Sequence, residues 1–283
     1  MRLARTANSY QGREPLTDDT LRAYAPSIFA EDKHASRSER YAYIPTIHAL
    51  NGLRKEGFLP FYVAQSRTRH EDRREFTKHL LRLRHMNHIH AQTVGTEFPE
   101  ISLLNSHDGT SSYQMDAGIY RLVCSNGLIV DAGDVQSLKV PHKGDVRNQV
   151  IEAAYEIVES FPVVQSKMMA MKETKLLPAI QEALAEEAIQ LRYDDPAKSA
   201  PITPAQVLTP KRAADAGQDA WSVFNRAQEH LVRGGLNGAA AHGGRQRTRP
   251  VTSIQENVKL NKALWSLTER VTAILRGETW QAA

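Results

Sequence analysis

Between residues 61 and 104, apolar and polar positions alternate in a way that predicts an antiparallel β-meander. Residues 61–69 and 76–85 each follow a period of two, the repeat of a strand with two different faces. The charged sequence HEDRRE between them suits the tip of a hairpin. A short apolar segment at residues 100–104 predicts a third strand. Three antiparallel strands are therefore expected in the core.

A helix is predicted on each side of this meander. Before it, residues 46–53 carry a helical apolar pattern that Gly57 ends, because glycine tolerates the left-handed conformation of a helix C-cap. After it, a Thr or Ser N-cap at residues 110–112 precedes Met115 and Ile119, which with two further apolar residues recur at i, i+4, i+7 and i+8. The pattern thus predicts a helix-β-β-β-helix core.

The fold class expected is α+β, an antiparallel meander packed on helices with a largely helical C-terminal extension. The first residues are polar and read as a mobile arm with one short helical turn near residues 17–24. A helix from about residue 166 to 193 is expected to kink or split at Pro178, which lacks a backbone donor. The predicted divisions are an arm at residues 1–40, a core at 41–144 with further strands at 128–130 and 135–140, a helical region at 145–193, a Pro-rich linker at 194–214, and C-terminal helices at 215–283 with a flexible Gly-rich loop at 234–244.

Composition narrows the class of protein. At 283 residues, 41% hydrophobic and 24% charged, the chain matches an ordinary globular protein. No apolar run approaches the roughly 20 residues that span a membrane, and the N-terminal sequence lacks the apolar core of a secretory signal. The single cysteine, Cys124, excludes an internal disulfide and fits a reducing compartment. A cytoplasmic location without membrane association is expected.

Positive charge is concentrated on the predicted strands. Residues 67–90 hold seven Lys or Arg against three acids, although the net charge of the chain is only +4. Cations on alternate strand positions can line a groove that follows nucleic-acid phosphates; the alternative is a solvated sheet face. Alternation places Phe61 and Tyr62 on opposite faces, so a shared stacking surface does not follow from the first strand. The basic positions with this spacing are Arg67, Arg69, Lys78, Arg82 and Arg84.

Histidines cluster where the second strand ends. The sequence HMNHIH points His88 and His90 the same way along an extended segment, and His107 and Asp108 follow one strand later. Imidazole and carboxylate groups could hold a divalent metal there; polar residues at a strand end are the alternative. The sequence contains no HExxH, Walker loop, GxGxxG or GxSxG motif, so no cofactor and no nucleotide hydrolysis are expected.

The polar loop at residues 105–112 precedes the predicted second helix. Backbone N–H groups at a helix N-terminus can bind a phosphate oxygen, and hydroxyl groups add donors. Plain helix capping accounts for the hydroxyls but leaves Asn105, His107 and Asp108 unexplained. The loop and Arg121 are therefore candidates to flank a groove.

Several segments resemble a known family. LLNSHDGTSSYQMDAGIYRLVCSNGLIV is similar to the signature of a phage- and plasmid-borne family known as a domain of unknown function. RYAYIPTIHAL near the start, and WSVFNRAQEHLVRGG and ALWSL near the end, extend the resemblance over most of the chain from about residue 40. The order helix, three-stranded meander, helix also resembles single-strand annealing proteins, the phage Red-beta and Erf group and the Rad-type proteins. That architecture implies rings or filaments that hold single-stranded DNA without ATP.

These observations lead to a hypothesis: a non-enzymatic, oligomeric protein of a phage or plasmid that binds and anneals single-stranded DNA in recombination. Two alternatives stay open. One is a metal-dependent nuclease or hydrolase using His88, His90, His107 and Asp108, and the other is a protein that binds a host defence factor through its helical tail. The candidate nucleic-acid-binding residues are Arg67, Arg69, Lys78, Arg82, Arg84, Arg121, Asn105, His107, Asp108, Ser111, Arg245 and Arg247.

Overall fold

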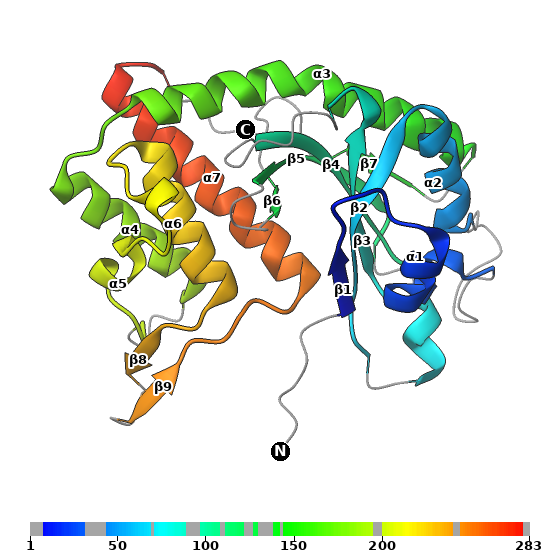
Figure 1. The fold of residues 1–283 in the computed structure, drawn as a ribbon, viewed down its shortest axis with the longest axis horizontal. Coiled ribbons are helices and arrows are strands. Elements are labelled where there is room, and N and C mark those ends of the chain that lie inside the picture. The colour runs from blue at the N-terminus through cyan, green and yellow to red at the C-terminus, as the bar shows by residue number, and fades with distance from the viewer. Residues whose placement is uncertain are drawn as a thin grey trace. The chain divides into compact units, whose positions relative to one another are not determined.

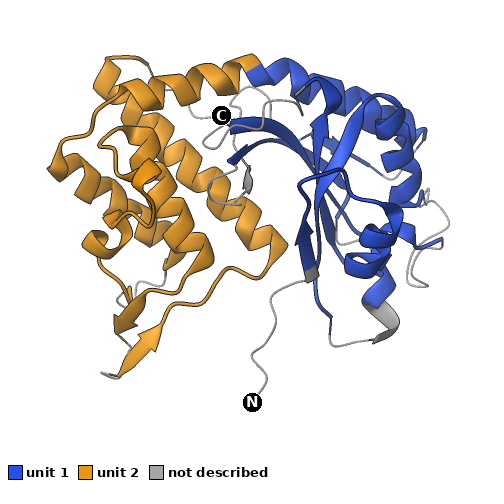
Figure 2. Ribbon diagram, in the orientation of Figure 1, with its two compact units in different colours: residues 1–161 blue, residues 162–283 orange. Residues whose placement is uncertain are grey.

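The protein has an α+β fold, as predicted, with an antiparallel sheet and a largely helical C-terminal part (Figure 1). The computed structural model describes residues 8–31, 44–68, 71–88, 97–107, 111–121, 127–129, 138–141, 144–194, 200–239 and 244–279. The chain divides into two compact units, unit 1 at residues 1–161 and unit 2 at residues 162–283 (Figure 2). Among the described helices, none is long and apolar enough to cross a membrane.

Unit 1 is built on a sheet in which every described pair of neighbouring strands is antiparallel. The order is β1-β2-β3-β4-β5-β6, and β7 pairs with β5. The predicted meander corresponds to β2, β3 and β4, and the two further predicted strands to β6 and β7. The bounds are β1 Asn8–Gln11, β2 Phe58–Gln65, β3 His79–His85, β4 Glu97–Asn105, β5 Tyr113–Arg121, β6 Gly127–Ile129 and β7 Leu138–Val140.

Helices pack on one face of this sheet. Leu81 and Leu83 of β3 point to this face and are fully buried, as strand alternation requires. Phe58 of β2 contacts the ring of Tyr155 on α3, with 5.7 Å between centroids. Short 3₁₀ turns η2 (Glu71–Phe76) and η3 (Met86–His88) flank β3. The covering elements are α1 Asp18–Tyr24, the 3₁₀ turn η1 Pro26–Phe29, α2 Thr46–Lys55 and the N-terminal part of α3, a helix that spans Val146–Glu173 (Figure 1).

The predicted second core helix is wrong, because residues 113–121 form strand β5. Met115, Ala117 and Ile119 alternate onto the helix-covered face and are at most 3% exposed. Positions four apart lie on one face of a helix and also on one face of a strand, so the spacing of Met115 and Ile119 fitted both. The residues after Arg121 that suggested a helical period lie outside the described part of the chain.

The expected mobile arm at residues 1–40 is wrong for its described part. Asn8–Gln11 forms β1 and pairs with β2. The short helix expected near residues 17–24 is confirmed by α1, and the Thr17 hydroxyl caps it by accepting from the Thr20 backbone N–H at 3.3 Å. The sequence NSYQ of β1 has no apolar alternation, so only its pairing with β2 reveals the strand.

Unit 2 is mostly helical. Its core contains Trp265 of α7, whose ring meets those of Trp221 and Phe224 on α6 edge to face. A two-stranded hairpin, β8 and β9, projects from this unit (Figure 1). The bounds are α4 Pro178–Arg192, α5 Pro204–Leu208, η4 Ala213–Asp215, α6 Ala220–Arg233, β8 Asn237–Ala239, β9 Arg245–Arg247 and α7 Ile254–Arg276.

The structure changes three expectations for this half of the chain. The prediction that a new helix begins near residue 166 is wrong, since α3 continues from Val146 to Glu173. Pro178 does separate two helices, because it is the first residue of α4. The Pro-rich linker at 194–214 contains α5, and the Gly-rich loop at 234–244 contains β8. Buried apolar residues continue at helical spacing past residue 166, which explains why α3 does not end there. They are Ile157, Phe161, Val164, Met168 and Met171.

Candidate functional site

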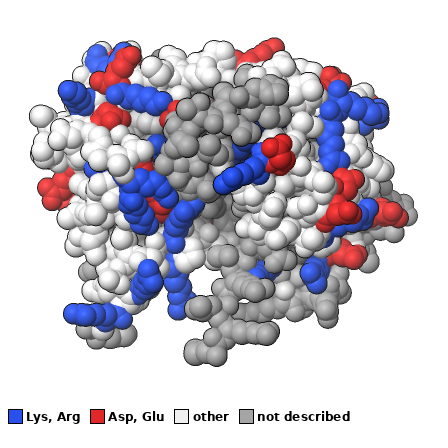
Figure 3. Space-filling view, viewed as in Figure 1, with Lys and Arg blue, Asp and Glu red and all other residues white. Residues whose placement is uncertain are grey.

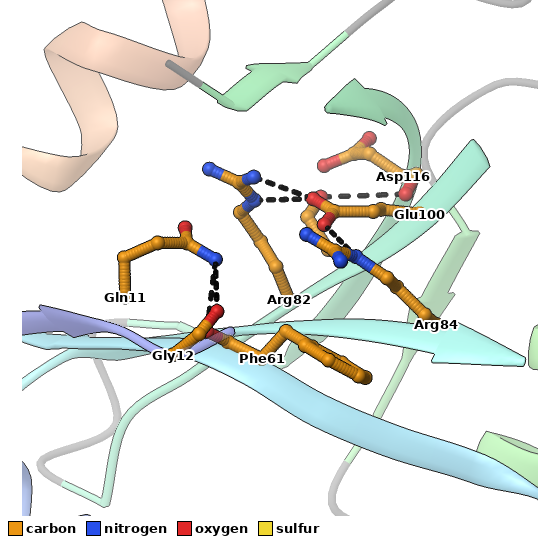
Figure 4. A network of polar contacts seen from close by, with 8 residues as sticks. Gln11, Gly12, Phe61, Arg82, Arg84, Glu100 and Asp116 are labelled. Atoms are coloured by element: carbon orange, nitrogen blue, oxygen red, sulfur yellow. Dashed lines mark hydrogen bonds and ion pairs between the residues drawn. The ribbon is translucent and has the colours of Figure 1, made fainter. Parts of the chain in front are cut away.

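Two arginines of the sheet share one buried carboxylate. Arg82 and Arg84 lie on the face of the sheet opposite to α1 and α2, and Glu100 of β4 lies between their guanidinium groups (Figure 4). Arg82 Nε donates to Glu100 Oε2 at 2.6 Å, and Arg84 Nε donates to Glu100 Oε1 at 2.7 Å. All three residues are at most 6% exposed. The two positive charges are therefore held inside the protein by an internal anion.

Aromatic rings surround these guanidinium groups. The Arg84 Cζ atom lies 4.3 Å from the centroids of both Phe61 and Tyr120, and the Arg82 Cζ atom lies 4.9 Å from that of Tyr62. Arginine stacks well on ring faces, and such contacts add stability when the cation is desolvated. The two arginines are therefore held by packing against aromatic rings as well as by their ion pairs with Glu100.

A β-bulge brings Phe61 and Tyr62 of β2 to the same cluster. The register of β2 against β3 shifts between Pro60 and Tyr62, so Phe61 has no partner in the ladder. A bulge changes the direction of one side chain by breaking the alternation. The sequence-based assignment of Phe61 and Tyr62 to opposite faces is wrong for this reason, and only the paired strands reveal the bulge.

The cluster carries further polar groups across the sheet. The register aligns Arg82 of β3 with Ser102 of β4 and Asp116 of β5. Asp116 is 4% exposed and accepts a hydrogen bond from Gln114 Nε2 at 3.1 Å. Arg84 Nη2 is buried and donates no hydrogen bond within the described structure. Glu100 was not among the sequence-based candidates, because its pairing depends on strand register.

The opposite face of the sheet holds a second buried polar network, centred on Thr46 of α2. The Thr46 hydroxyl lies 2.9 Å from His79 Nε2 and 3.1 Å from His107 Nε2, and it accepts from Asn105 Nδ2 at 3.0 Å. One hydroxyl proton can serve only one of the two imidazoles, so the other must donate its own N–H. All four residues are fully buried. Packing thus accounts for Asn105 and His107, which capping did not explain.

The remaining candidates do not gather at one place. Arg67 is exposed beyond the end of β2, and Lys78 is half-buried just before β3. Arg121 is buried beside Glu97, with 3.7 Å between Arg121 Nε and Glu97 Oε1, and Ser111 donates from Oγ to the Ser112 carbonyl at 3.0 Å. The positions outside the described part of the structure are Arg69, His90, Asp108 and the side chain of His88.

The metal hypothesis loses part of its basis. His107 belongs to the Thr46 network. Among the residues that the structure describes, no group of three His, Cys, Asp or Glu side chains is arranged to hold a metal ion. The other three candidate ligands fall outside those residues.

Unit 2 carries a second group of cations, which we name the basic surface. Lys211 lies near the guanidinium groups of Arg212, Arg233 and Arg247. Partial desolvation is the main cause that lowers the pKa of Lys211 below its ordinary value, and these three positive charges lower it further. The charge of Glu229 acts in the opposite direction. Figure 3 shows Lys and Arg side chains gathered at the lower left of the view, over the hairpin of unit 2. The basic surface consists of Lys211, Arg212, Arg233, Arg245 and Arg247.

One buried carboxylate organises part of the basic surface. Glu229 of α6 accepts two hydrogen bonds from Arg212, and its Oε1 lies 3.7 Å from Arg233 Nη1. The Glu229 side chain is only 6% exposed, whereas those of Arg212 and Arg233 are 25% and 40% exposed. Glu229 thus holds Arg212 and Arg233 at the start of the basic surface. Arg212 is half-buried, and the other four cations of this surface are exposed.

The hairpin adds two arginines to the basic surface. Arg245 and Arg247 lie on β9, and every residue of this strand is exposed. Arg247 Nε donates to the Gly235 carbonyl at 2.9 Å, which holds the guanidinium group near the backbone, while the residue as a whole stays exposed. The sequence-based candidates Arg245 and Arg247 thus fall within the basic surface. Lys211, Arg212 and Arg233 were missed, because each lies twelve or more positions before Arg245 in the sequence.

Comparison with known proteins identifies the family. The sequence profile described as "Domain of unknown function (DUF932)" matches residues 33–265. The chain belongs to this family. The match spans both units and confirms the membership that the quoted segments suggested.

Two relatives from Escherichia coli (strain K12) are similar over almost their whole length. The UPF0380 protein YfjQ and the UPF0380 protein YafZ are each 48% identical to the chain over 270 residues, which is 95% of this chain and 96% of each relative. No solved structure is significantly similar to this chain. The family and these relatives carry no named activity, so function must be argued from the arrangement of residues.

Proposed function

We propose that this protein binds single-stranded DNA and promotes annealing of complementary strands without ATP. The observation that carries the proposal is the basic surface of unit 2, where Lys211, Arg212 and Arg233 lie near Glu229 and the exposed strand β9 adds Arg245 and Arg247. Clustered Lys and Arg bind a phosphate backbone chiefly by releasing its condensed counterions, which requires no contact with the bases.

The sheet plays a different part in this proposal. Arg82 and Arg84 already neutralise Glu100 and are buried among aromatic rings, so their guanidinium groups are not presented to a phosphate backbone. Arg245 and Arg247 have the same alternate spacing on a strand that is exposed throughout. The DNA-binding role therefore moves from the sheet of unit 1 to the hairpin of unit 2.

Annealing is the activity that suits such a surface. Two complementary strands repel each other through their phosphates, and a protein that neutralises the backbone lowers this barrier. Because contacts limited to the backbone leave the base edges free, the strands can still pair. No nucleotide-hydrolysis motif occurs in the sequence, in agreement with a process that uses no ATP. We place the protein in the cytoplasm, acting in recombination of a phage or plasmid as a ring or filament.

The direct test follows the pairing of two complementary labelled oligonucleotides by fluorescence. The wild-type protein should accelerate pairing at low salt, and the effect should fall steeply as salt rises. The variant Arg245→Gln/Arg247→Gln should lose most of the acceleration. Electron microscopy of the purified protein, with and without single-stranded DNA, tests the ring or filament.

A matched control separates the effect of the basic surface from the effect of the total charge of the protein. Arg13 and Arg67 are exposed cations of unit 1, so Arg13→Gln/Arg67→Gln removes the same charge from elsewhere and should anneal like the wild type. Absence of acceleration by the wild type, together with no gel shift of single strands at low salt, would remove the proposal. Equal loss of activity in both double variants would refute the assignment to the basic surface.

A further inference from the structure

An open cavity of about 620 Å³ lies in unit 1, between α2 and the N-terminal turn of α3. Its volume falls in the range of small-molecule sites. The cavity lies away from the buried arginine cluster, because α2 covers the other face of the sheet. The lining includes His48, Lys55 and Glu56 of the α2 segment and Asp145, Arg147 and Ile151 of the α3 segment.

A glycine sets the approach of the two helices beside the cavity. A Cβ atom added to Gly52 would lie 3.1 Å from Ile151 Cδ1 and 3.3 Å from Arg147 Cγ. Such contacts are tighter than ordinary van der Waals packing, so a larger residue would push α3 away. Gly52 therefore allows the side chains of both helices to line one space.

The acidic groups of the lining already have partners. Glu56 Oε2 accepts a hydrogen bond from the Tyr155 hydroxyl at 2.7 Å, and this bond raises the pKa of Tyr155. The Asp145 carboxylate caps α3, accepting from the Asn148 backbone N–H at 3.3 Å and from Asn148 Nδ2 at 2.6 Å. Both carboxylates thus serve the protein itself.

The cationic groups of the lining are not engaged in this way. No hydrogen bond or ion pair joins the side chains of Lys55, Arg147 or His48 to any residue that the structure describes. These three groups come from two helices and border the same cavity. An ammonium, a guanidinium and an imidazole around one space match the oxygens of a phosphate group.

From this arrangement we propose that the cavity binds a small phosphomonoester. Lys55 and Arg147 contact the phosphate oxygens, and His48 donates a third hydrogen bond. Ile44 and Ile151 supply apolar contact for the organic part of the ligand. The dianionic charge of a phosphomonoester is matched by the two cations, whereas a neutral ligand would leave both without partners. The site is independent of the DNA-binding basic surface in unit 2.

Isothermal titration calorimetry with adenosine 5′-monophosphate as probe tests the proposal, with adenosine as the control ligand lacking the phosphate. The nucleotide should bind and the nucleoside should not. Because each substitution removes a charge-assisted hydrogen bond to the phosphate, Lys55→Met and Arg147→Met should each weaken nucleotide binding by at least about tenfold. Lys259→Met removes an exposed lysine of α7 and should bind like the wild type.

Any of three results would overturn the site: equal binding of nucleotide and nucleoside, no binding of either, or unchanged nucleotide affinity in Lys55→Met/Arg147→Met. The substituted side chains are exposed and make no described polar contact, so loss of folding is not expected. Binding of single-stranded DNA by the same double variant should match the wild type, so failure of this site and failure of the proposed function give different results.

Discussion

Strands β3 and β9 both carry the pattern Arg-x-Arg, and the two pairs of arginines have opposite environments. Arg82 and Arg84 of β3 are buried, paired with Glu100 and stacked on aromatic rings. Arg245 and Arg247 of β9 are exposed and lie on a two-stranded hairpin. The same spacing therefore supplies an interior ion-pair network in one unit and a charged surface in the other.

The residue between the two arginines marks the difference. It is Leu83 in β3, which is fully buried on the helix-covered face, and Gln246 in β9, which is exposed. Leu83 packs under the helices, and the arginines on either side of it are buried on the other face with Glu100 as their anion, because a buried charge is costly unless it is paired. Period-two spacing alone identifies the shared face but not its exposure.

The largest expected effect is on the stability of unit 1. Glu100→Gln keeps the shape of the side chain but leaves two buried guanidinium groups without an anion, so the free energy of unfolding should fall by about 3–5 kcal/mol. Urea denaturation measures this loss. Asp18→Asn is the matched control, since the pair of Asp18 with Arg54 is exposed and worth ~0–1 kcal/mol. Similar losses in the two variants would contradict the account of the sheet.

A smaller effect is expected when the carboxylate of the basic surface is changed. Glu229→Gln should lower the free energy of unfolding by only about 1 kcal/mol, because Arg212 and Arg233 keep access to water. The same variant adds positive charge to the basic surface and should tighten the binding of single-stranded DNA. Fluorescence anisotropy and urea denaturation together test this. A loss as large as that of Glu100→Gln would erase the contrast between the units.

The smallest effect concerns pH. Burial lowers the pKa of His230 below 6.5, and Lys211 acts in the same direction against a hydrogen bond to the Thr209 carbonyl and the charge of Glu229. The folded state therefore favours neutral His230, so its contribution to stability is present above about pH 6.5 and is lost as the pH falls toward the lower folded-state pKa.

Thermal unfolding between pH 7 and pH 5 measures this contribution. His230→Gln should lose less stability over that interval than the wild type. Identical profiles for wild type and His230→Gln would mean that burial of His230 does not couple to pH.

The sequence predicted those elements whose signals are local. The helix ending near Gly57, which has a φ of 85°, and strands β2, β3 and β4 follow from period and capping residues. Strand β5 was predicted as a helix, since the four-residue spacing of Met115 and Ile119 suits both structures. Strand β1 was missed because its polar sequence reveals nothing before it pairs.

The site was predictable only in part, for a related reason. Alternation placed Arg82 and Arg84 on one face correctly, but Glu100 and the bulge at Phe61 depend on the register between strands. The basic surface joins Lys211 to Arg247 through the fold of unit 2 rather than through neighbouring sequence. The periodicity of a sequence shows which residues share a face, but not which distant segments come into contact. Both clusters could therefore be identified only from the structure.

The central claim is that exposed arginines of unit 2, and not the arginines of the sheet, hold the DNA backbone. The most direct measurement is the salt dependence of single-stranded DNA binding, followed by fluorescence anisotropy. Each lost phosphate contact lowers the slope of log affinity against log salt by about 0.7 for single strands, so Arg245→Gln/Arg247→Gln should reduce it by about 1.4. Arg13→Gln/Arg67→Gln should keep the wild-type slope. A wild-type slope in Arg245→Gln/Arg247→Gln would contradict the claim.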